Sequence, residues 1–287
     1  MTRVLLTVDT ALSWPSHVRG ESWRQNLAGT LARLSKQLES LRARNLKACF
    51  FADPMPALVY GLEPIRRIVE PILAAGQEVQ LLLNPVWQSV AEGVAEGARF
   101  ELTCYDSEDQ LDLIETARDL LVEAGAPTPV AFRAGGYAAD VRTLAALLQA
   151  GLRFDSSHRP GGSALPFEPD LAGPADLGGL VEVPVTLQLD LSSGDNIEAS
   201  LNGALRARCP LVTVAGDSSD LAGKDGRLES LCAFLAARAV ELPTAHFADL
   251  EPVAAAATCV PLPNPAWRRT SRMAEPAWPH ALHAQSV

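Results

Sequence analysis

Histidine is scarce in this sequence, and its cysteines show none of the spacings that bind metal ions. Five histidines and five cysteines occur among 287 residues, and no two cysteines form a C-x-x-C pair. The cysteines are Cys49, Cys104, Cys209, Cys232 and Cys259. An odd number of widely spaced cysteines predicts neither a disulfide framework nor a thiolate zinc site. This usage fits a reducing compartment.

Long apolar runs and an excess of basic residues are also missing. No apolar run approaches the roughly 18 residues of a membrane-spanning helix, and the apolar stretch at 4–8 is too short for a signal peptide. The 34 acidic residues outnumber the 24 basic ones, which gives a formal net charge of -10. An acidic surface repels phosphate groups. We therefore expect a cytoplasmic protein with no nucleic-acid partner and no membrane partner.

The sequence does contain a regular alternation of strand and helix patterns. Strand patterns are predicted at 3–9, 46–53, 77–84, 129–136, 152–157, 180–189, 207–217 and 244–250, and helical patterns at 22–44, 63–76, 106–126, 139–151 and 226–241. Such repeats indicate right-handed crossovers and a parallel sheet, either closed into a barrel or open and doubly wound. We expect one domain over 1–255 and an irregular, proline-rich extension over 256–287.

Polar side chains are predicted at the ends of these strands. In parallel α/β folds the functional face lies at the carboxyl ends of the strands. The predicted strand ends carry Asp9, Asp53, Asn84, Arg133, Asp155 and Asp217. These residues are therefore the first candidates for a site.

Four segments in series resemble the motifs of the polysaccharide deacetylase (NodB-like, carbohydrate esterase) family. They are LLTVDT (5–10), AAGQEVQLLLNPVW (74–87), FRAGGY (132–137) and FDSS (154–157). Their order and spacing agree with the family over roughly residues 3–250. The resemblance implies an irregular (β/α)7-type barrel, with parallel strands and surrounding helices.

The resemblance also implies a chemistry, which this sequence retains only in part. Family members remove an acetyl group from a sugar, using a divalent metal held by one Asp and two His, with a neighbouring Asp as base. Asp9 matches the base, and Arg133, Tyr137 and Asp155 match family positions. These matches make Asp9, Arg133 and Asp155 the candidate catalytic residues.

The metal ligands of the family do not match. The metal-binding Asp corresponds to Thr10, the first His to Leu82, and the second His to Val86 or, in a shorter variant of the motif, to Asn84. The late catalytic His falls near Gly216. Zinc needs about three donors of nitrogen, sulfur or charged oxygen. We therefore expect no metal and no cofactor, although the family would use zinc or another divalent metal.

Several residues near the strand ends are candidates for substrate binding. Trp14, Trp87 and Tyr137 would form an aromatic platform for a sugar ring or, alternatively, ordinary packing. Asn84 and His158 complete this set, although a solvated loop position is the plainer interpretation of His158. The mouth of the expected barrel is the end formed by the carboxyl ends of its strands. Arg133 and Asp155 would form an ion pair across this mouth, with either a structural or a substrate role.

Three functions remain open at this point. The first is a degenerate, metal-free and catalytically impaired homologue that binds an acetylated glycan or a partner protein. The second is an active hydrolase of acetylated sugars or esters, with Asp9 as base and Arg133 facing the oxyanion. The third is a non-enzymatic interaction protein that uses the tail at 264–287.

Overall fold

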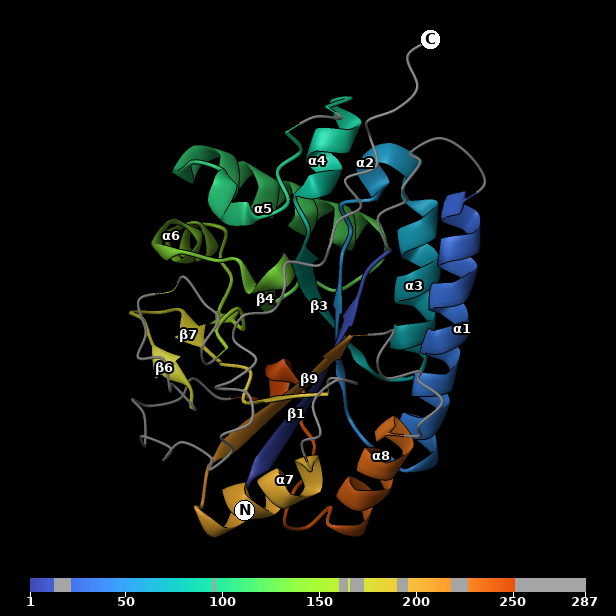
Figure 1. The fold of residues 1–287 in the computed structure, drawn as a ribbon, viewed down its shortest axis with the longest axis vertical. Helices are drawn as coiled ribbons and strands as arrows, with labels where there is room; N and C mark the ends of the chain where they lie inside the picture. The colour runs from blue at the N-terminus through green and yellow to red at the C-terminus, as the bar shows by residue number, and fades with distance from the viewer. Residues whose placement is uncertain are drawn as a thin grey trace.

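The structure is a computed structural model that describes residues 1–12, 22–94, 97–159, 165, 173–189, 196–217 and 227–250. Within them, nine strands form one curled sheet in the order β6-β7-β5-β4-β3-β2-β1-β9-β8, in which only β6 runs antiparallel to its neighbour (Figure 1). The expected α/β barrel architecture is thereby confirmed, as a mostly parallel sheet surrounded by helices. No helix in this part of the chain has the length and apolar character needed to cross a membrane.

The elements follow the predicted alternation closely. The strands are β1 (Arg3–Thr10), β2 (Cys49–Ala52), β3 (Glu78–Leu83), β4 (Ala131–Ala134), β5 (Phe154–Asp155), β6 (Ala175–Asp176), β7 (Val181–Glu182), β8 (Leu187–Gln188) and β9 (Leu211–Asp217). The α-helices are α1 (Ser22–Ala43), α2 (Ala57–Tyr60), α3 (Glu63–Ala74), α4 (Val86–Ala91), α5 (Ser107–Glu123), α6 (Val141–Gln149), α7 (Ile197–Arg206) and α8 (Arg227–Ala237). Short 3₁₀ turns are η1 (Leu102–Cys104), η2 (Gly135–Tyr137) and η3 (Phe247–Asp249). The helices α2, α4 and α7 were not predicted.

One extended segment brings the two edges of the curled sheet together. The backbone N–H groups of Val181 and Val183 donate to carbonyls on the β5 side, and those of Thr186 and Leu189 donate to carbonyls of β9. The prediction of a single strand at 180–189 is therefore wrong. The segment forms two short strands, β7 and β8, which lie at different places in the sheet order.

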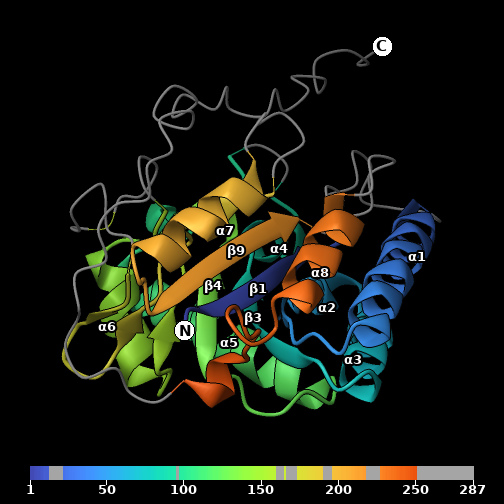
Figure 2. The ribbon, with the colours of Figure 1, turned by 90° about the horizontal axis from the view of Figure 1, so that it is seen from below.

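The alternation of side chains along each strand separates two apolar cores. On β1, Val4, Leu6 and Val8 belong to the large core under the helices, whereas Leu5 belongs to a smaller core inside the barrel. The helices α1, α3 and α8 lie together over one side of the sheet (Figures 1 and 2). The apolar stripe predicted along 22–44 faces this outer core.

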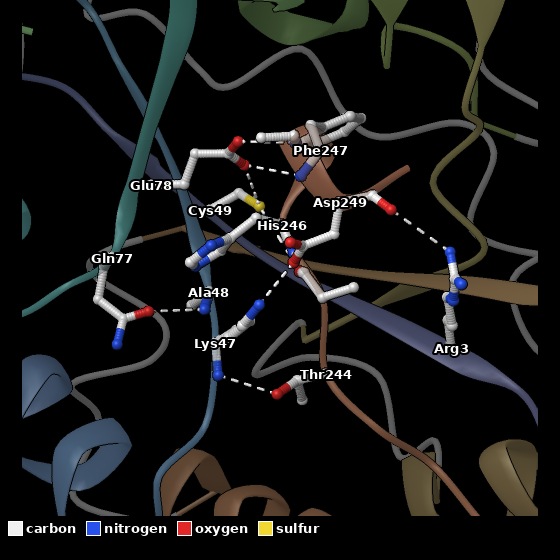
Figure 3. Close-up of polar contacts among 12 residues, drawn as sticks. Arg3, Lys47, Ala48, Cys49, Gln77, Glu78, Thr244, His246, Phe247 and Asp249 are labelled. Carbon is white, nitrogen blue, oxygen red and sulfur yellow. Dashed lines mark hydrogen bonds and ion pairs between the residues drawn. The ribbon is translucent and has the colours of Figure 1, made fainter. Parts of the chain in front are cut away.

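The segment predicted as the last strand, 244–250, is not a strand. It makes one β-bridge, between Thr244 and Val4, and then turns into η3. Glu78 accepts hydrogen bonds from the backbone N–H groups of Phe247 (2.7 Å) and Ala248 (2.9 Å), and Lys47 pairs with Asp249 at 2.7 Å (Figure 3). Because Glu78 begins β3, η3 covers the amino-terminal end of the barrel, opposite the candidate residues.

The cysteines depart from the sequence-based expectation in one respect. Cys49, Cys104 and Cys232 are free, but Cys209 is disulfide-bonded. The spacing of the cysteines predicted no disulfide framework and did not reveal the disulfide of Cys209, because spacing along the sequence does not report which thiols meet in the fold.

Candidate functional site at the carboxyl ends of the strands

A buried ion pair lies at the carboxyl end of the barrel. Nη1 of Arg133, on β4, donates to Oδ1 of Asp9, on β1, at 2.5 Å. The side chain of Arg133 is fully buried, whereas that of Asp9 keeps 21% of its surface exposed. Asp9 is therefore the member of the pair that a ligand can reach.

The guanidinium of Arg133 is held by four hydrogen bonds. Nη1 also donates to Oγ1 of Thr7 (3.1 Å), Nε donates to the carbonyl of Ser156 (3.1 Å), and Nη2 donates to Oγ of Ser156 (2.9 Å). The ring of Phe51 lies 4.2 Å from the guanidinium carbon and covers one face. Four of the five N–H groups of Arg133 are thus used within the protein.

Burial and charge act in opposite directions on this pair. Burial raises the pKa of Asp9, and Arg133 only partly offsets the effect, so that the pKa stays above its ordinary value. Burial lowers the pKa of Arg133, but the charges of Asp9, Tyr137 and Asp155 and the hydrogen bond to Asp9 together outweigh that effect, so that the net pKa is raised. The pair predicted from the sequence, Arg133 with Asp155, is therefore wrong in its acidic partner.

Asp155 instead faces a second buried acid. Asp155 on β5 and Glu182 on β7 are register partners in adjacent parallel strands, and both are fully buried. Oδ1 of Asp155 accepts a hydrogen bond from Oγ of Ser157 at 2.6 Å. Burial raises the pKa of both carboxyl groups, that of Glu182 well above its ordinary value.

A third acid, Asp53, organises the neighbouring part of the mouth. Its carboxylate accepts hydrogen bonds from Nδ2 of Asn84 (2.9 Å), from the backbone N–H of Met55 (3.1 Å) and from the side chain of Trp87. Burial raises the pKa of Asp53 to about 7, against the lowering effect of these donors. Oδ1 of Asn84 packs against Gly135, where an added Cβ would lie only 2.0 Å away.

The predicted aromatic platform is not formed. Trp87 is 1% exposed and packs edge-on against Tyr60, with ring centroids 5.8 Å apart, so it offers no face to a sugar. Trp14 lies outside the described residues. Tyr137 does lie at the mouth, half-buried, with a positive φ of 62° and its ring beside the guanidinium groups of Arg133 and Arg159.

His158 also differs from its expected setting. Its side chain is buried, not solvated, and burial lowers its pKa to about 4. The imidazole is therefore neutral at pH 7. Its backbone N–H donates to Oε1 of Glu182 at 3.2 Å, which places it beside the acidic pair.

No family model matches the sequence, and no curated protein matches it. Solved structures do match. A protein from Mycobacterium smegmatis assigned as a polysaccharide deacetylase has a TM-score of 0.52 and 18% identity, over 88% of this chain and 95% of its own. A family 4 carbohydrate esterase pseudoenzyme from Bacillus anthracis has a TM-score of 0.50 and 12% identity, over 87% of this chain and 65% of its own.

This chain has the fold of the polysaccharide deacetylases. The same fold occurs in the PuuE allantoinase, which matches with a TM-score of 0.58 and 14% identity over 86% of this chain and 88% of its own. The deacetylase fold therefore carries more than one chemistry. The function of this chain therefore has to be inferred from the residues at the mouth of the barrel.

The residues that the motif resemblance assigns to the family's metal-ligand positions do not fit a metal. Leu82 is 4% exposed and packs in the core inside the barrel, and Val86 packs in the outer core. The side-chain amide of Asn84 donates a hydrogen bond to Asp53. The buried hydroxyl group of Thr10 has no hydrogen-bond partner among the described residues. Across the same residues, no group of three His, Cys, Asp or Glu side chains is arranged to hold a metal ion.

Sequence reasoning missed several polar residues of this mouth. Thr7, Ser156 and Ser157 hold Arg133 and its strand. They lie inside the quoted motifs LLTVDT and FDSS, but the motif match gave these hydroxyl residues no role of their own. Asp53 was predicted among the strand-end candidates, but no role was assigned to it. Glu182 had a detectable signal, because it is a lone acid inside the apolar run LVEVPV, and a fully buried carboxyl group requires a partner.

Proposed function

We propose that this chain is a metal-free, catalytically impaired homologue of the polysaccharide deacetylases that binds an acetylated glycan at the Asp9–Arg133 pair. The observation that carries the proposal is the donor set at the mouth. Leucine, threonine and asparagine or valine stand where an Asp-His-His set would hold the metal, while Asp9, Arg133, Tyr137 and Asp155 are all retained.

The contacts at the mouth support binding of a neutral, polar ligand. Asp9 keeps one side open and accepts hydrogen bonds, which suits sugar hydroxyl and acetamido N–H groups. Tyr137 offers an aromatic ring and a hydroxyl group beside Asp9. Burial and, to a smaller extent, the charge of Asp9 raise the pKa of this hydroxyl group. An amphipathic ring next to a charged acceptor is a common arrangement for a sugar.

Calorimetric titration of EDTA-treated protein with N-acetylglucosamine oligomers, and with glucose oligomers of equal length, tests the proposal. We expect saturable binding of the acetylated oligomer without metal, weakened about tenfold in Asp9→Asn, equivalent to one lost hydrogen bond to a charged group. Asp176→Asn, which alters an exposed acid on β6, serves as the matched control. Acetate release that requires added zinc, cobalt or manganese and disappears in Asp9→Asn would contradict the proposal.

A second candidate is an active hydrolase with Asp9 as base. The raised pKa of Asp9, caused by burial, makes its carboxylate a better proton acceptor than that of an ordinary aspartate. The commitment of four Arg133 donors to Thr7, Asp9 and Ser156 argues against the oxyanion role assigned to it. Hydrolysis of activated acetyl esters in EDTA, lost in Asp9→Asn, would support this candidate, and no turnover across a panel of acetylated sugars and esters would refute it.

The third candidate, an interaction protein that uses residues 264–287, concerns a segment outside the described residues. Deletion of 256–287 tests it. Unchanged glycan binding, together with unchanged partner capture by the truncated chain, would refute it.

A further inference from the structure

The acidic pair at the carboxyl end of the barrel is fully enclosed. Asp155 and Glu182 face each other as register partners on β5 and β7, and each is 0% exposed. Two ionised carboxylates in this position would each lack solvation and would repel each other. A buried pair of this kind binds at least one proton.

The hydrogen bonds of the pair leave one oxygen on each acid without a donor. Oδ1 of Asp155 accepts from Ser157, and Oε1 of Glu182 accepts from the backbone N–H of His158. Oδ2 of Asp155 and Oε2 of Glu182 are buried, and no hydrogen-bond donor among the described residues reaches either oxygen. Since an ionised carboxylate only accepts hydrogen bonds, a single proton between the two side chains satisfies both oxygens.

The charges around the pair do not remove the need for this proton. Arg133 on β4 is the nearby cation, and Asp9 already pairs with it. His158, in the segment after β5, is neutral at pH 7. On β6, Asp176 is exposed and caps a turn by accepting from Gly178 and Gly179. Asp155 accepts the shorter hydrogen bond, 2.6 Å from the hydroxyl of Ser157 against 3.2 Å between Glu182 and the backbone N–H of His158, which favours the charge on Asp155 and the proton on Glu182.

The pair is connected to the candidate site through residues 155–158. Ser156 holds Arg133 through its carbonyl and its hydroxyl, and Oγ of Ser157 accepts from the backbone N–H of Ala134 at 2.9 Å. Glu182 binds both ends of this segment, through Asp155 and through the backbone of His158. The position of the segment therefore sets the position of Arg133 and, through it, of Asp9.

We propose that Glu182 is a positioning residue of the candidate site, whose carboxylic acid donates to Asp155 and so holds the 155–158 segment that fixes Arg133 against Asp9. The inference rests on the location of the proposed function, but not on its ligand. When the pH rises, the proton leaves to solvent and two negative charges remain. They repel each other and compete with Asp9 for Arg133.

The pH dependence has a definite sign. Because the pKa of Glu182 is higher in the folded chain than in the unfolded one, the folded state binds more protons above the ordinary glutamic acid pKa. The contribution of Glu182 to the free energy of unfolding is therefore fully present below the ordinary glutamic acid pKa and is lost as the pH rises through the folded-state pKa of Glu182. A single proton changes the unfolding equilibrium constant by at most about tenfold per pH unit.

Three variants separate a shared proton from simple packing. In Glu182→Gln the amide cannot titrate, but it can donate to Asp155 and accept from His158. Glu182→Ala removes both bonds, and Asp176→Asn is the matched control on the adjacent strand. We expect the unfolding constant of the wild type and of Asp176→Asn to rise with pH above the ordinary glutamic acid pKa, and that of Glu182→Gln to rise less steeply while the variant remains folded. Asp9 and Asp53, whose pKa values are also raised, keep their share of the slope in all three proteins.

Two spectroscopic readouts complete the test. At neutral pH we expect infrared C=O absorption from protonated carboxyl groups, of which one component is lost in Glu182→Gln while that of Asp53 remains. We also expect the Nε–H NMR signal of Arg133 to shift with pH in the wild type, to stay constant with pH in Glu182→Gln, and to be displaced at every pH in Glu182→Ala. An unchanged slope in Glu182→Gln, or an Arg133 signal indifferent to Glu182, would overturn the inference. Failure of N-acetylglucosamine oligomers to bind, with both readouts as expected, would refute the proposed function alone.

Discussion

At the scale of single residues, the mouth of the barrel depends on close contacts between strand ends. Gly135 follows β4, and Asn84 follows β3. The side chain of Asn84 lies where a side chain on residue 135 would have to go. Asn84 in turn donates to Asp53, so one glycine makes room for a polar contact between three strand ends.

Gly135→Ala should therefore destabilise the chain. The new Cβ would meet Oδ1 of Asn84 at 2.0 Å and the carbonyl oxygen of Leu83 at 2.9 Å, and overpacking of this kind costs about 1–3 kcal/mol. Urea denaturation measures the loss. Gly203→Ala in α7 is the control, because nothing lies within 4 Å of its Cβ position and alanine favours the helix by about 0.5–1 kcal/mol. Equal stability of both variants would contradict the described packing.

The Asp9–Arg133 pair leads to a second prediction. Asp9→Asn removes the counterion of a fully buried guanidinium, and an unpaired buried charge costs about 3 kcal/mol. The free energy of unfolding from denaturation should fall by about that amount, against less than about 0.5 kcal/mol for the exposed Asp176→Asn. A loss below about 1 kcal/mol would mean that Arg133 finds another counterion.

At the scale of elements, sequence periodicity located most helices and strands but not the edges of the sheet. The run at 180–189 looks continuous because both halves are apolar and extended. Its division into β7 and β8 depends on which strand each half meets. The run at 244–250 has the pattern of a strand. Its backbone N–H groups at Phe247 and Ala248 instead donate hydrogen bonds to the side chain of Glu78. Such long-range partners are not encoded in local pattern.

The same limit applies to the candidate site. Asp9, Arg133 and Asp155 were predicted because strand ends and family motifs both point to them. The exchange of partners, Asp9 for Asp155, was not, since β1 is separated from β4 by two strands in the sheet order and only the curl of the sheet brings Asp9 to Arg133. Trp87 was misplaced because α4 turns its side chain into the outer core, and the periodicity did not predict that helix.

The join between β8 and β9 makes a prediction at this scale. Thr186 donates to the carbonyl of Thr213 (3.0 Å) and accepts from its backbone N–H (2.9 Å). Thr186→Val keeps the shape but leaves a buried N–H without an acceptor, which costs about 1–3 kcal/mol. Hydrogen exchange should show lost protection at 211–215, whereas Thr186→Ser should retain it. Unchanged protection in the valine variant would contradict the role of this contact.

At the scale of the whole molecule, the fold by itself does not determine the chemistry. The architecture matches deacetylases, an allantoinase and a pseudoenzyme at 18% identity or less. Only resemblance to family motifs favoured the barrel over an open sheet, because composition and periodicity suit both. We propose that the mouth is built from an ion pair and a shared proton and binds no metal.

Metal content tests that claim most directly. The purified full-length chain would be loaded with zinc or cobalt, desalted and measured by elemental analysis, with Asp9→Asn in parallel. Because Leu82 supplies no donor and Asn84 is engaged by Asp53, we expect metal far below one equivalent per chain, equal in both proteins. Close to one equivalent in the wild type, reduced in Asp9→Asn, would contradict the account and restore metal-dependent deacetylation as the function of this site.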